Sequence, residues 1–570
     1  MNDKDFQKII DAMGIDEKIG QMFMGNICGG EGVEFARSNF GRYRFGALQF
    51  SGVFERFIRG GDYMPCGVDR NKPLDETAEF IFNVKKAGLE ITGLPVIMAG
   101  DQEGSISNSI FRRRNISMMP SQMGFGASGK LRNAYLAAKV SAKEVKTLGL
   151  DMLYGPSLDV LTSPQNPEIG ARSFSGDPET VAAMGEQFIR AYAEEDVISN
   201  VKHFPGRGHG TGDAHRELES IGLGRKELER LAILPFRRAV AAGVDSFMIA
   251  HTLYPSLEKE RLPASLSQRI ITGLLRQDMG FDGVVIPDDL TMFAISKNFG
   301  IPQAAAMCLA AGSDMIFMKV PEQYAPSIEM VKKFLREKKL SEDRLNQSLL
   351  RILRLKYKRG LFGRKTFSAK KVLSTVGCGG HAAVAGRVAK DAILVMRNTE
   401  GALPLRIRPG GSVLAVIPRD MHVVLSNDDT LSHDMLPRAL RRHFGNVQQV
   451  VVDEVPTKYQ AYEAVGRAKN ADAVVFGIYS AGASDSLLEL LNDIAGLGRP
   501  VIAVITNSPF WVTRLPDEVR GAVCTFGIST FSFNAVADVI AGKARPTAKL
   551  PAGLNAQFPA GFSAATRKGK

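Results

Sequence analysis

The sequence has few cysteines and no long apolar run, and both absences narrow the class of protein. Its five cysteines are scattered over 570 residues and form no CxxC pair, which argues against a disulfide framework or a zinc ribbon. Five free thiols are therefore expected, as in a reducing cytoplasm. No run of about 18 apolar residues occurs, so no transmembrane helix is expected. Residues 1–25 read as a charged amphipathic helix, which is not the pattern of a secretory signal.

Tryptophan is also scarce, with one in the chain, and the net charge is +12 with a sequence pI near 9.3. A basic balance permits an acidic partner such as nucleic acid. The basic residues are spread along the chain and form no arm, however, so neither nucleic acid nor a membrane is expected as a partner. The apolar fraction of 45% and the charged fraction of 23% are ordinary for a globular protein.

The first 360 residues alternate short apolar runs with segments of helical period, for example 178–194 and 225–242. The runs are β-branched or apolar, and they are predicted as strands at 46–50, 95–100, 152–154, 197–202, 246–251, 284–288 and 315–319. Repeated βα units require parallel strands, because a parallel pair needs a crossover connection. Seven or eight such units in this length predict a (β/α)8-type barrel, and the fold class is α/β.

Polar residues follow several of these strands, and their positions indicate a site. Asp101 to Glu103 follow one strand, Lys202 and His203 end another, and His251 and the pair Asp288–Asp289 end two more. In a barrel the carboxyl ends of the strands converge on one mouth, where active sites lie. We therefore expect these side chains to lie close together.

A second unit follows the barrel. A basic helix ends at about residue 360 in glycine-rich sequence, which is typical of a helix stop. The predicted division is a catalytic barrel at 1–360, a linker at 361–384 and an α/β sandwich domain at 385–570. Its strands, alternating with helices, are predicted at 392–396, 412–417, 449–452, 473–479, 501–506 and 522–526, as an open and mostly parallel sheet.

The segment 201–215, VKHFPGRGHGTGDAH, carries the strongest chemical signal. It leaves a strand through a loop with four glycines, the kind of loop that brings backbone close to a ligand. Asp213 and His215 are two residues apart, so the carboxylate can orient the imidazole and raise its basicity. His215 is therefore a candidate proton donor and acceptor near neutral pH.

Asp288 and Asp289 close the strand at 284–286 and precede a helical turn. One of them can cap that helix, and the other can point into the mouth. The spacing alone leaves catalysis and capping equally open.

Taken together, these segments resemble glycoside hydrolase family 3, in its β-N-acetylglucosaminidase branch. The resemblance spans nearly the whole chain and is carried by VKHFPGRG…DAH, VVIPDDLTM, GDQEG, GPSLDV, IGARSFSGDP, AHTLYP…LPASLS, LRLKYKRGLF and DAILVMRN…LPL. The loop departs from the family in having Arg207 and His209 where many relatives carry His and Asp. Residues 480–485, SAGASD, lie where the glucosidase branch of the family places its acid, and they contain no Glu.

The resemblance implies a mechanism for named residues. Asp288 would attack the anomeric carbon, and His215, oriented by Asp213, would protonate the leaving oxygen and later activate water. The hydroxyls of the terminal sugar would be bound by Asp101, Arg172, Lys202 and His203. Neither a metal nor another cofactor is required. For Arg172 a structural salt bridge is the alternative.

The implied activity is a cytoplasmic, exo-acting β-N-acetylglucosaminidase. Its substrate would be a GlcNAc-containing oligosaccharide or muropeptide, as in peptidoglycan recycling, or a fragment of chitin. The alternatives are a phosphorylase that releases the sugar 1-phosphate, a β-glucosidase, and a non-catalytic sugar-binding homologue. Phosphorolysis is raised by the histidine base and by the positive charge of Arg207 and His209 near the mouth.

Overall fold

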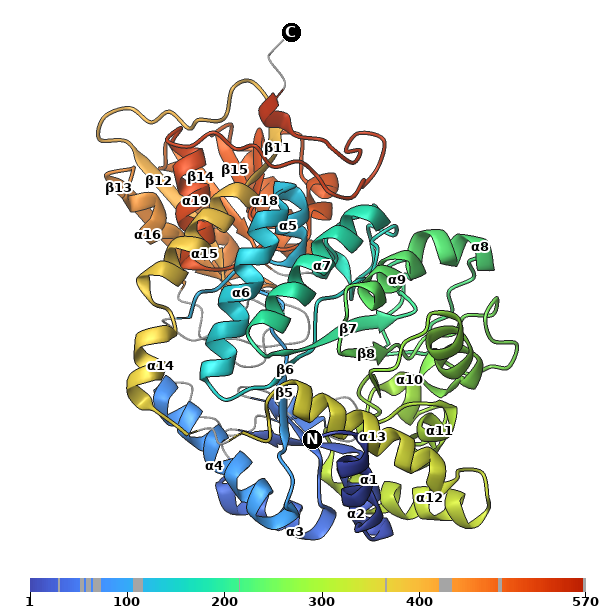
Figure 1. Cartoon of the computed structure of the whole chain (residues 1–570). Helices are drawn as coiled ribbons and strands as arrows, with labels where there is room; N and C mark the ends of the chain where they lie inside the picture. The colour runs from blue at the N-terminus through green and yellow to red at the C-terminus, as the bar shows by residue number, and fades with distance from the viewer. Residues whose placement is uncertain are drawn as a thin grey trace.

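The first part of the chain folds into a barrel of parallel strands enclosed by helices (Figure 1). The structure, a computed structural model, describes residues 1–28, 31–51, 56–57, 63–64, 73–105, 116–214, 216–363, 366–419, 433–479 and 484–566. Eight strands are hydrogen-bonded in the order β10-β1-β2-β5-β6-β7-β8-β9. They are β1 (Phe23–Cys28), β2 (Ala47–Ser51), β5 (Ile97–Gly100), β6 (Met152–Leu153), β7 (Ile198–Phe204), β8 (Ser246–Ile249), β9 (Val284–Pro287) and β10 (Ile316–Phe317). A separate two-stranded ribbon pairs β3 (Arg56–Phe57) with β4 (Tyr63–Met64).

The barrel closes between its last two strands in sequence. The backbone amide of Asp314 donates to the carbonyl of Val285 at 2.8 Å, and that of Leu290 donates to the carbonyl of Phe317 at 3.1 Å. These bonds join β9 to β10, which already pairs with β1. The structure therefore confirms the predicted (β/α)8-type barrel.

Helices alternate with the barrel strands, as expected for parallel pairing. They are α1 (Asp3–Asp11), α2 (Ile15–Gln21), α3 (Val33–Tyr43), α4 (Leu74–Thr92), α5 (Gln122–Ser128), α6 (Leu131–Thr147), α7 (Pro178–Glu194), α8 (Arg225–Leu228), α9 (Leu234–Ala241), α10 (Phe293–Ser296), α11 (Ile301–Ala311), α12 (Tyr324–Arg336) and α13 (Glu342–Lys358). The predicted helix at 178–194 is confirmed as α7. Asp177 caps it by accepting a hydrogen bond from the amide of Thr180, and Pro178 occupies the first turn.

The beginning of the chain differs from the prediction of a single helix over residues 1–25. Two helices, α1 and α2, are separated by a break at 12–14, and β1 begins at Phe23. Every residue of β1 is buried, because the strand lies in the barrel wall, and its apolar run therefore lacks the period of an amphipathic helix. Cys28 at the end of β1 is disulfide-bonded, so the prediction of five free thiols is wrong there. Cys308, Cys378 and Cys524 are free.

The second domain is a six-stranded sheet in the order β11-β16-β15-β14-β12-β13, parallel except for β11 against β16. Its strands are β11 (Leu394–Asn398), β12 (Ser412–Pro418), β13 (Asn446–Val452), β14 (Ala473–Ile478), β15 (Val501–Ile505) and β16 (Gly521–Cys524). Its helices are α15 (Gly379–Ala392), α16 (Met435–Arg441), α17 (Lys458–Lys469), α18 (Asp485–Ala495) and α19 (Thr530–Ile540). Each predicted strand has a counterpart, and the α/β sandwich is confirmed.

The chain reaches the second domain along α14 (Ala369–Thr375) and α15, drawn in yellow in Figure 1. Glu144 of the barrel accepts hydrogen bonds from the amide of Gly377 at 2.9 Å and from Nδ1 of His381 at 2.8 Å. Most of the segment predicted as a linker, 361–384, is thus helical and attached to the barrel. The division at 360 and 385 stays a prediction.

Two loops that leave the carboxyl ends of barrel strands hold the second domain. After β5, the amide of Ser121 donates to the carbonyl of Phe526 at 2.7 Å, and the hydroxyl of Ser105 accepts from the amide of Ile528 at 2.9 Å. After β6, the hydroxyl of Ser175 donates to the carbonyl of Pro551 at 2.7 Å. The second domain therefore sits beside the barrel mouth. Among the described residues, no helix is long and apolar enough to cross a membrane.

Candidate active site

The polar residues predicted to meet at the barrel mouth do meet there. Lys202, at the end of β7, extends its Nζ to 3.0 Å from Oδ1 of Asp101, which follows β5. His251, after β8, places Nε2 at 3.1 Å from the carbonyl oxygen of Asp289, which follows β9. The four strand ends thus meet in two contacting pairs, one between the residues after β5 and at the end of β7 and one between the residues after β8 and β9.

The two adjacent carboxylates after β9 have different surroundings. Asp289 is 4% exposed, and its Oδ1 accepts hydrogen bonds from the amide of Thr291 at 3.0 Å and from its hydroxyl at 2.7 Å. Its Oδ2 lies 3.5 Å from Nζ of Lys319. Asp288 is partly exposed, and its Oδ1 accepts from the amide of Asp289 at 2.8 Å. Asp289 therefore closes the turn at Thr291 and does not cap α10, whose N-cap position is Met292 and carries no side-chain hydrogen bond. Asp288 is the partly exposed carboxylate of the pair.

Asp288 is held in its ionised form. Burial raises the pKa of its carboxyl group, but His203, His251, the backbone amide of Asp289 and Arg207 lower it by more, so the net pKa is well below the ordinary value. Among the described residues, no cation forms an ion pair with Asp288 within 4.0 Å. The carboxylate is thus stabilised by its surroundings without a direct ion pair to a described cation.

A buried ion network lies on the β5 and β7 side of the mouth. Glu103 is the shared acceptor: its Oε1 is 2.6 Å from Nζ of Lys202, and Arg172 binds it in bidentate fashion at 2.7 and 2.9 Å. Burial raises the pKa of Glu103, but the charges of Arg172 and Lys202 bring it down to about 2. Arg172 thus forms the salt bridge named as its alternative role, in the same network as Lys202 and Asp101.

His203 is oriented by a carboxylate. Its Nδ1 donates to Oδ2 of Asp159 at 2.7 Å, and its Nε2 lies 3.4 Å from Nη2 of Arg172. Asp159 also accepts from the hydroxyl of Ser157 at 2.9 Å and from the amide of Arg207 at 2.7 Å. These contacts fix the imidazole plane and its tautomer.

The loop after β7 is held in place by an ion pair and by hydrogen bonds to Glu168. Nη1 of Arg207 donates to Oε1 of Glu168 at 2.8 Å, Nη2 of Arg207 pairs with Oε2, and that oxygen also accepts from the amide of Ala214 at 3.2 Å. The carboxylate of Asp213, with 14% of its side chain exposed, lies 3.9 Å from Nε of Arg216. His215 lies outside the described residues, so its pairing with Asp213 stays a prediction.

Glu103 and His251 were expected at the mouth from their positions at strand ends, but the sequence assigned them no role. Two further carboxylates of the site, Asp159 and Glu168, were not expected there. Asp159 lies in the GPSLDV segment, and Glu168 precedes IGARSF by one residue, but in a loop a single carboxylate gives no sign of its partner. Among the described residues, no group of three His, Cys, Asp or Glu side chains is placed to hold a metal ion.

Comparisons with known proteins agree with this geometry. Residues 15–355 match the glycosyl hydrolase family 3 N terminal domain, and residues 393–560 match its C-terminal domain. The chain is 31% identical over 334 residues to a beta-hexosaminidase A of Pseudoalteromonas piscicida, covering 55% of each protein. It is 27% identical over 322 residues to a beta-N-acetylglucosaminidase/beta-glucosidase of Cellulomonas fimi, covering 55% of this chain and 56% of that protein. The chain thus spans about half the length of these curated relatives.

Among solved structures, a glycoside hydrolase family 3 beta-N-acetylglucosaminidase from Paenibacillus sp. is 28% identical, with a TM-score of 0.85. The alignment covers 95% of this chain and 99% of that one, so both domains are shared. The two family matches together span most of the sequence. The chain belongs to glycosyl hydrolase family 3.

Proposed function

We propose that the chain is a retaining, exo-acting β-N-acetylglucosaminidase. The observation that carries the proposal is Asp288, an ionised and accessible carboxylate at a barrel mouth whose other charged groups are paired. An oxocarbenium-like transition state is stabilised by an adjacent anion, and a carboxylate of this kind can also form the covalent bond of a double displacement. The names of the relatives support GlcNAc as the sugar.

In the first step an oxygen of Asp288 bonds to the anomeric carbon as the bond to the leaving oxygen breaks. His215 gives its proton to that oxygen, and the products are a glycosyl-Asp288 ester and the free alcohol. In the second step His215 takes a proton from water, whose oxygen attacks the anomeric carbon and releases Asp288 as a carboxylate. Asp213 orients His215 throughout. The anomeric carbon is inverted twice, once in each step, so its configuration is retained.

The substrate hydroxyls are proposed to bind Asp101, Lys202, Arg172 and His203. Two of these groups, Asp101 and Lys202, contact each other at 3.0 Å, a spacing at which neighbouring hydroxyls of one ring can bind both. The carboxylate accepts and the ammonium donates, and charge-assisted hydrogen bonds of this kind are about twice as strong as neutral ones.

The natural substrate is proposed to be a peptidoglycan fragment or a chitin-derived oligosaccharide. A role in peptidoglycan recycling and a place in the cytoplasm are part of the same proposal. Disulfides such as the one at Cys28 are rare in a reducing compartment, so recovery of the chain outside the cytoplasm would overturn that part of the proposal. Fractionation of the source cells, followed by immunodetection of the chain, provides it.

Phosphorolysis loses one of the two observations that raised it, the positive charge of Arg207 and His209 near the mouth. Arg207 is 1% exposed and pairs with Glu168, so its charge is already neutralised. Burial lowers the pKa of His209, which favours the neutral ring at pH 7. Neither residue offers a free positive charge to an incoming phosphate.

The test is release of 4-nitrophenol from the β-N-acetylglucosaminide and from the β-glucoside, with and without phosphate. We expect turnover of the N-acetyl substrate, free GlcNAc as product, and no change when phosphate is added. Preferred turnover of the glucoside would overturn the sugar assignment. GlcNAc 1-phosphate as product would establish phosphorolysis, and no turnover of either glycoside or of a muropeptide would favour a non-catalytic sugar-binding protein.

A further inference from the structure

The main chain around the proposed nucleophile is held by the end of β8. The amide of Asp288 donates to the carbonyl of Ile249 at 3.0 Å, which continues the pairing of β8 with β9. The carbonyl of Asp289 accepts from the amide of Met292 at 3.0 Å and lies 3.1 Å from Nε2 of His251. The backbone before and after the Asp288 side chain is thus bound to β8 and to the residues that follow it.

The positions of the hydrogens on His251 follow from its two neighbours. A backbone carbonyl can only accept, so Nε2 carries a hydrogen and donates it to Asp289. Burial lowers the pKa of the His251 imidazole and favours the neutral ring, so Nδ1 accepts from the hydroxyl of Ser265 at 2.8 Å. Ser265 is itself held, because its amide donates to the carbonyl of Ala250 at 3.1 Å. The hydroxyl therefore fixes both the plane and the tautomer of the ring.

The backbone of Asp289 orients the carboxylate of Asp288. The amide of Asp289 donates to Oδ1 of Asp288 at 2.8 Å. The residue whose carbonyl binds His251 is therefore also the residue whose amide binds the proposed nucleophile. A misplacement of about 1 Å in a reacting group can cost about 100-fold in rate, so the position of this backbone matters for the attack on the anomeric carbon.

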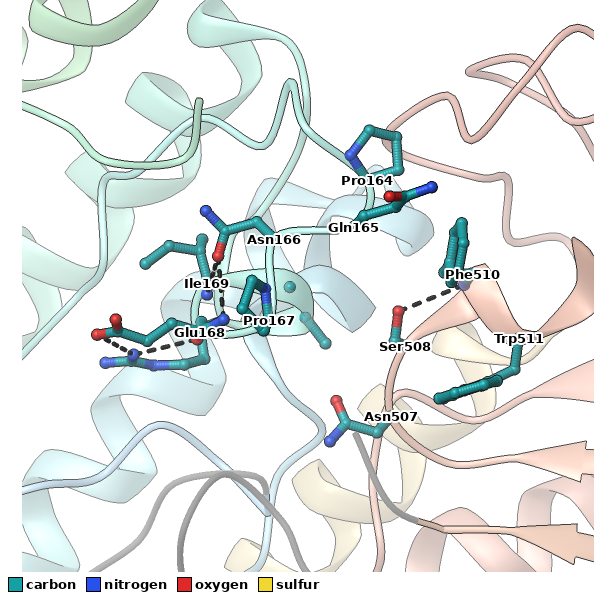
Figure 2. Close-up of a pocket in the computed structure, with 13 residues that line it drawn as sticks. Pro164, Gln165, Asn166, Pro167, Glu168, Ile169, Asn507, Ser508, Phe510 and Trp511 are labelled. Atoms are coloured by element: carbon teal, nitrogen blue, oxygen red, sulfur yellow. Dashed lines mark hydrogen bonds and ion pairs between the residues drawn. The ribbon is translucent and has the colours of Figure 1, made fainter. Parts of the chain in front are cut away.

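The loop that carries the proposed acid/base residue is held by other contacts. Asn166 accepts from the amide of Glu168 at 3.0 Å (Figure 2). Nδ2 of Asn166 donates to the carbonyls of Arg207 and Gly210 in the loop after β7, at 3.2 and 2.9 Å. None of these contacts involves His251. A change at His251 is therefore expected to disturb the nucleophile and to leave the acid/base loop in place.

We propose that His251 is a positioning residue for the nucleophile. Its Nε2–H holds the Asp289 backbone that orients Asp288, and Ser265 keeps the imidazole in the tautomer that can donate. The inference rests on the proposed function for the role of Asp288. His251 is fully buried, so it acts through Asp288 and not on the sugar. The proposal also gives a role to the segment AHTLYP…LPASLS, which contains both His251 and Ser265.

Two amide substitutions separate the Nε2 contact from the mere presence of a polar side chain. His251→Gln can place its amide nitrogen near the position of Nε2 and donate to Asp289, whereas the shorter His251→Asn reaches only the position of Nδ1. On 4-nitrophenyl N-acetylglucosaminide we expect kcat to fall about 100-fold in His251→Asn and no more than about tenfold in His251→Gln. KM, and Kd for GlcNAc, should stay within about threefold, because the lost interaction acts in the transition state.

Ser265→Ala is the second test, because it removes one hydroxyl and leaves His251 in place. We expect kcat to fall about fivefold, the cost of one hydrogen bond, with KM unchanged. The double variant with His251→Asn should lose no more than His251→Asn alone, since both changes act through the same contact.

His443→Asn is the matched control. Nε2 of His443 also binds an acceptor, Oδ1 of Asp538 at 2.7 Å, but this pair lies in the second domain. The substitution should leave kcat unchanged, and calorimetry of each variant verifies that it is folded.

Equal losses of kcat in His251→Asn and His251→Gln, losses in KM in place of kcat, or additive losses in the double variant would overturn the inference. An unchanged kcat in Ser265→Ala would do the same. These results all require an unaltered chain that cleaves a GlcNAc glycoside. If the unaltered chain cleaves none, the proposed function fails, and the inference fails with it.

Discussion

At the residue scale, the site depends on the different surroundings of two adjacent carboxylates, Asp288 and Asp289. One oxygen of Asp289 accepts from Thr291 and the other lies near Lys319, whereas Asp288 is partly exposed and accepts from the amide of Asp289. The sequence showed the pair but left the assignment open, because both residues follow the same strand. The difference arises from Thr291, which is local, and from Lys319 and His251, which lie far away in the sequence.

This difference predicts unequal effects of two conservative substitutions. Asp288→Asn should lower kcat/KM on 4-nitrophenyl N-acetylglucosaminide by about 10³-fold or more, equivalent to roughly 4 kcal/mol of lost transition-state stabilisation. Asp289→Asn keeps an acceptor for Thr291 and should lose at least tenfold less. Similar losses in both variants, measured on folded protein, would contradict the assignment.

The pKa of a single residue, Glu103, predicts how the stability of the folded chain depends on pH. Glu103 has a pKa of about 2 in the folded chain, below that of an ordinary carboxyl group, because of Arg172 and Lys202. A depressed carboxyl pKa adds stability that is fully present above about pH 4.5 and is lost as the pH falls toward 2. Glu103→Gln should therefore flatten the dependence of Tm on pH in this window, as measured by calorimetry.

The exposed Glu79 offers a control for that experiment. Glu79→Gln should leave the pH profile of Tm unchanged. A profile for Glu103→Gln that is as steep as that of the unaltered chain would show that the network does not lower the pKa of Glu103.

At the scale of elements, the loop after β7 is positioned by the ion pair between Arg207 and Glu168. Removing one partner of a buried pair typically costs about 3–5 kcal/mol, because the other charge stays buried. Glu168→Gln should therefore lower Tm by several degrees and kcat by about tenfold or more, since the lost charge weakens the pair with Arg207 that positions Ala214 next to His215. Calorimetry and steady-state kinetics measure both effects.

Glu186 is the matched control, because it forms a bidentate pair with Arg238 whose two side chains are 29% and 39% exposed. Exposed ion pairs of this kind contribute up to about 1 kcal/mol to stability. Glu186→Gln should therefore leave kcat unchanged and lower Tm by less than Glu168→Gln does. Equal effects of the two substitutions would show that the Arg207 pair has no special part in positioning the loop.

The helices and strands were largely predictable from the sequence, but the side-chain contacts between them were not. Short β-branched runs with intervening helical periods identified seven strands of the barrel and all six of the second sheet. The strand β1 was missed because its short apolar run directly follows an amphipathic helix. Asp101, Lys202, His203 and Asp288 were found from their positions at strand ends. Glu168 was missed because its contact with Arg207 joins loops 39 residues apart, and no local pattern encodes that distance.

At the scale of the whole molecule, the two domains share apolar packing. Met123, Ala127, Leu161, Ile169 and Ala171 belong to the barrel part of the chain but lie in the hydrophobic cluster of the second domain. Cooperative unfolding of both domains is expected, because the second domain's cluster loses these five side chains when the barrel unfolds.

We therefore predict a single calorimetric transition for the full chain. Ile169→Ala should lower the temperature of that one transition, since removing buried methyl groups costs about 2–5 kcal/mol. Two resolved transitions, with the substitution moving one of them, would contradict a shared core. The sequence alone gave no sign of this coupling, because the five side chains lie in segments assigned to the barrel.

If Asp288 forms a covalent bond to the sugar, that bond can be trapped and located. The chain is incubated with 2-acetamido-2-deoxy-5-fluoro-β-glucosyl fluoride, whose fluorine at C5 slows both steps and whose fluoride leaving group favours the first. The account predicts loss of activity and one added 5-fluoro-GlcNAc unit on the peptide that contains Asp288, located by mass spectrometry. A label on another carboxylate, or release of product with inverted configuration and no label, would contradict it.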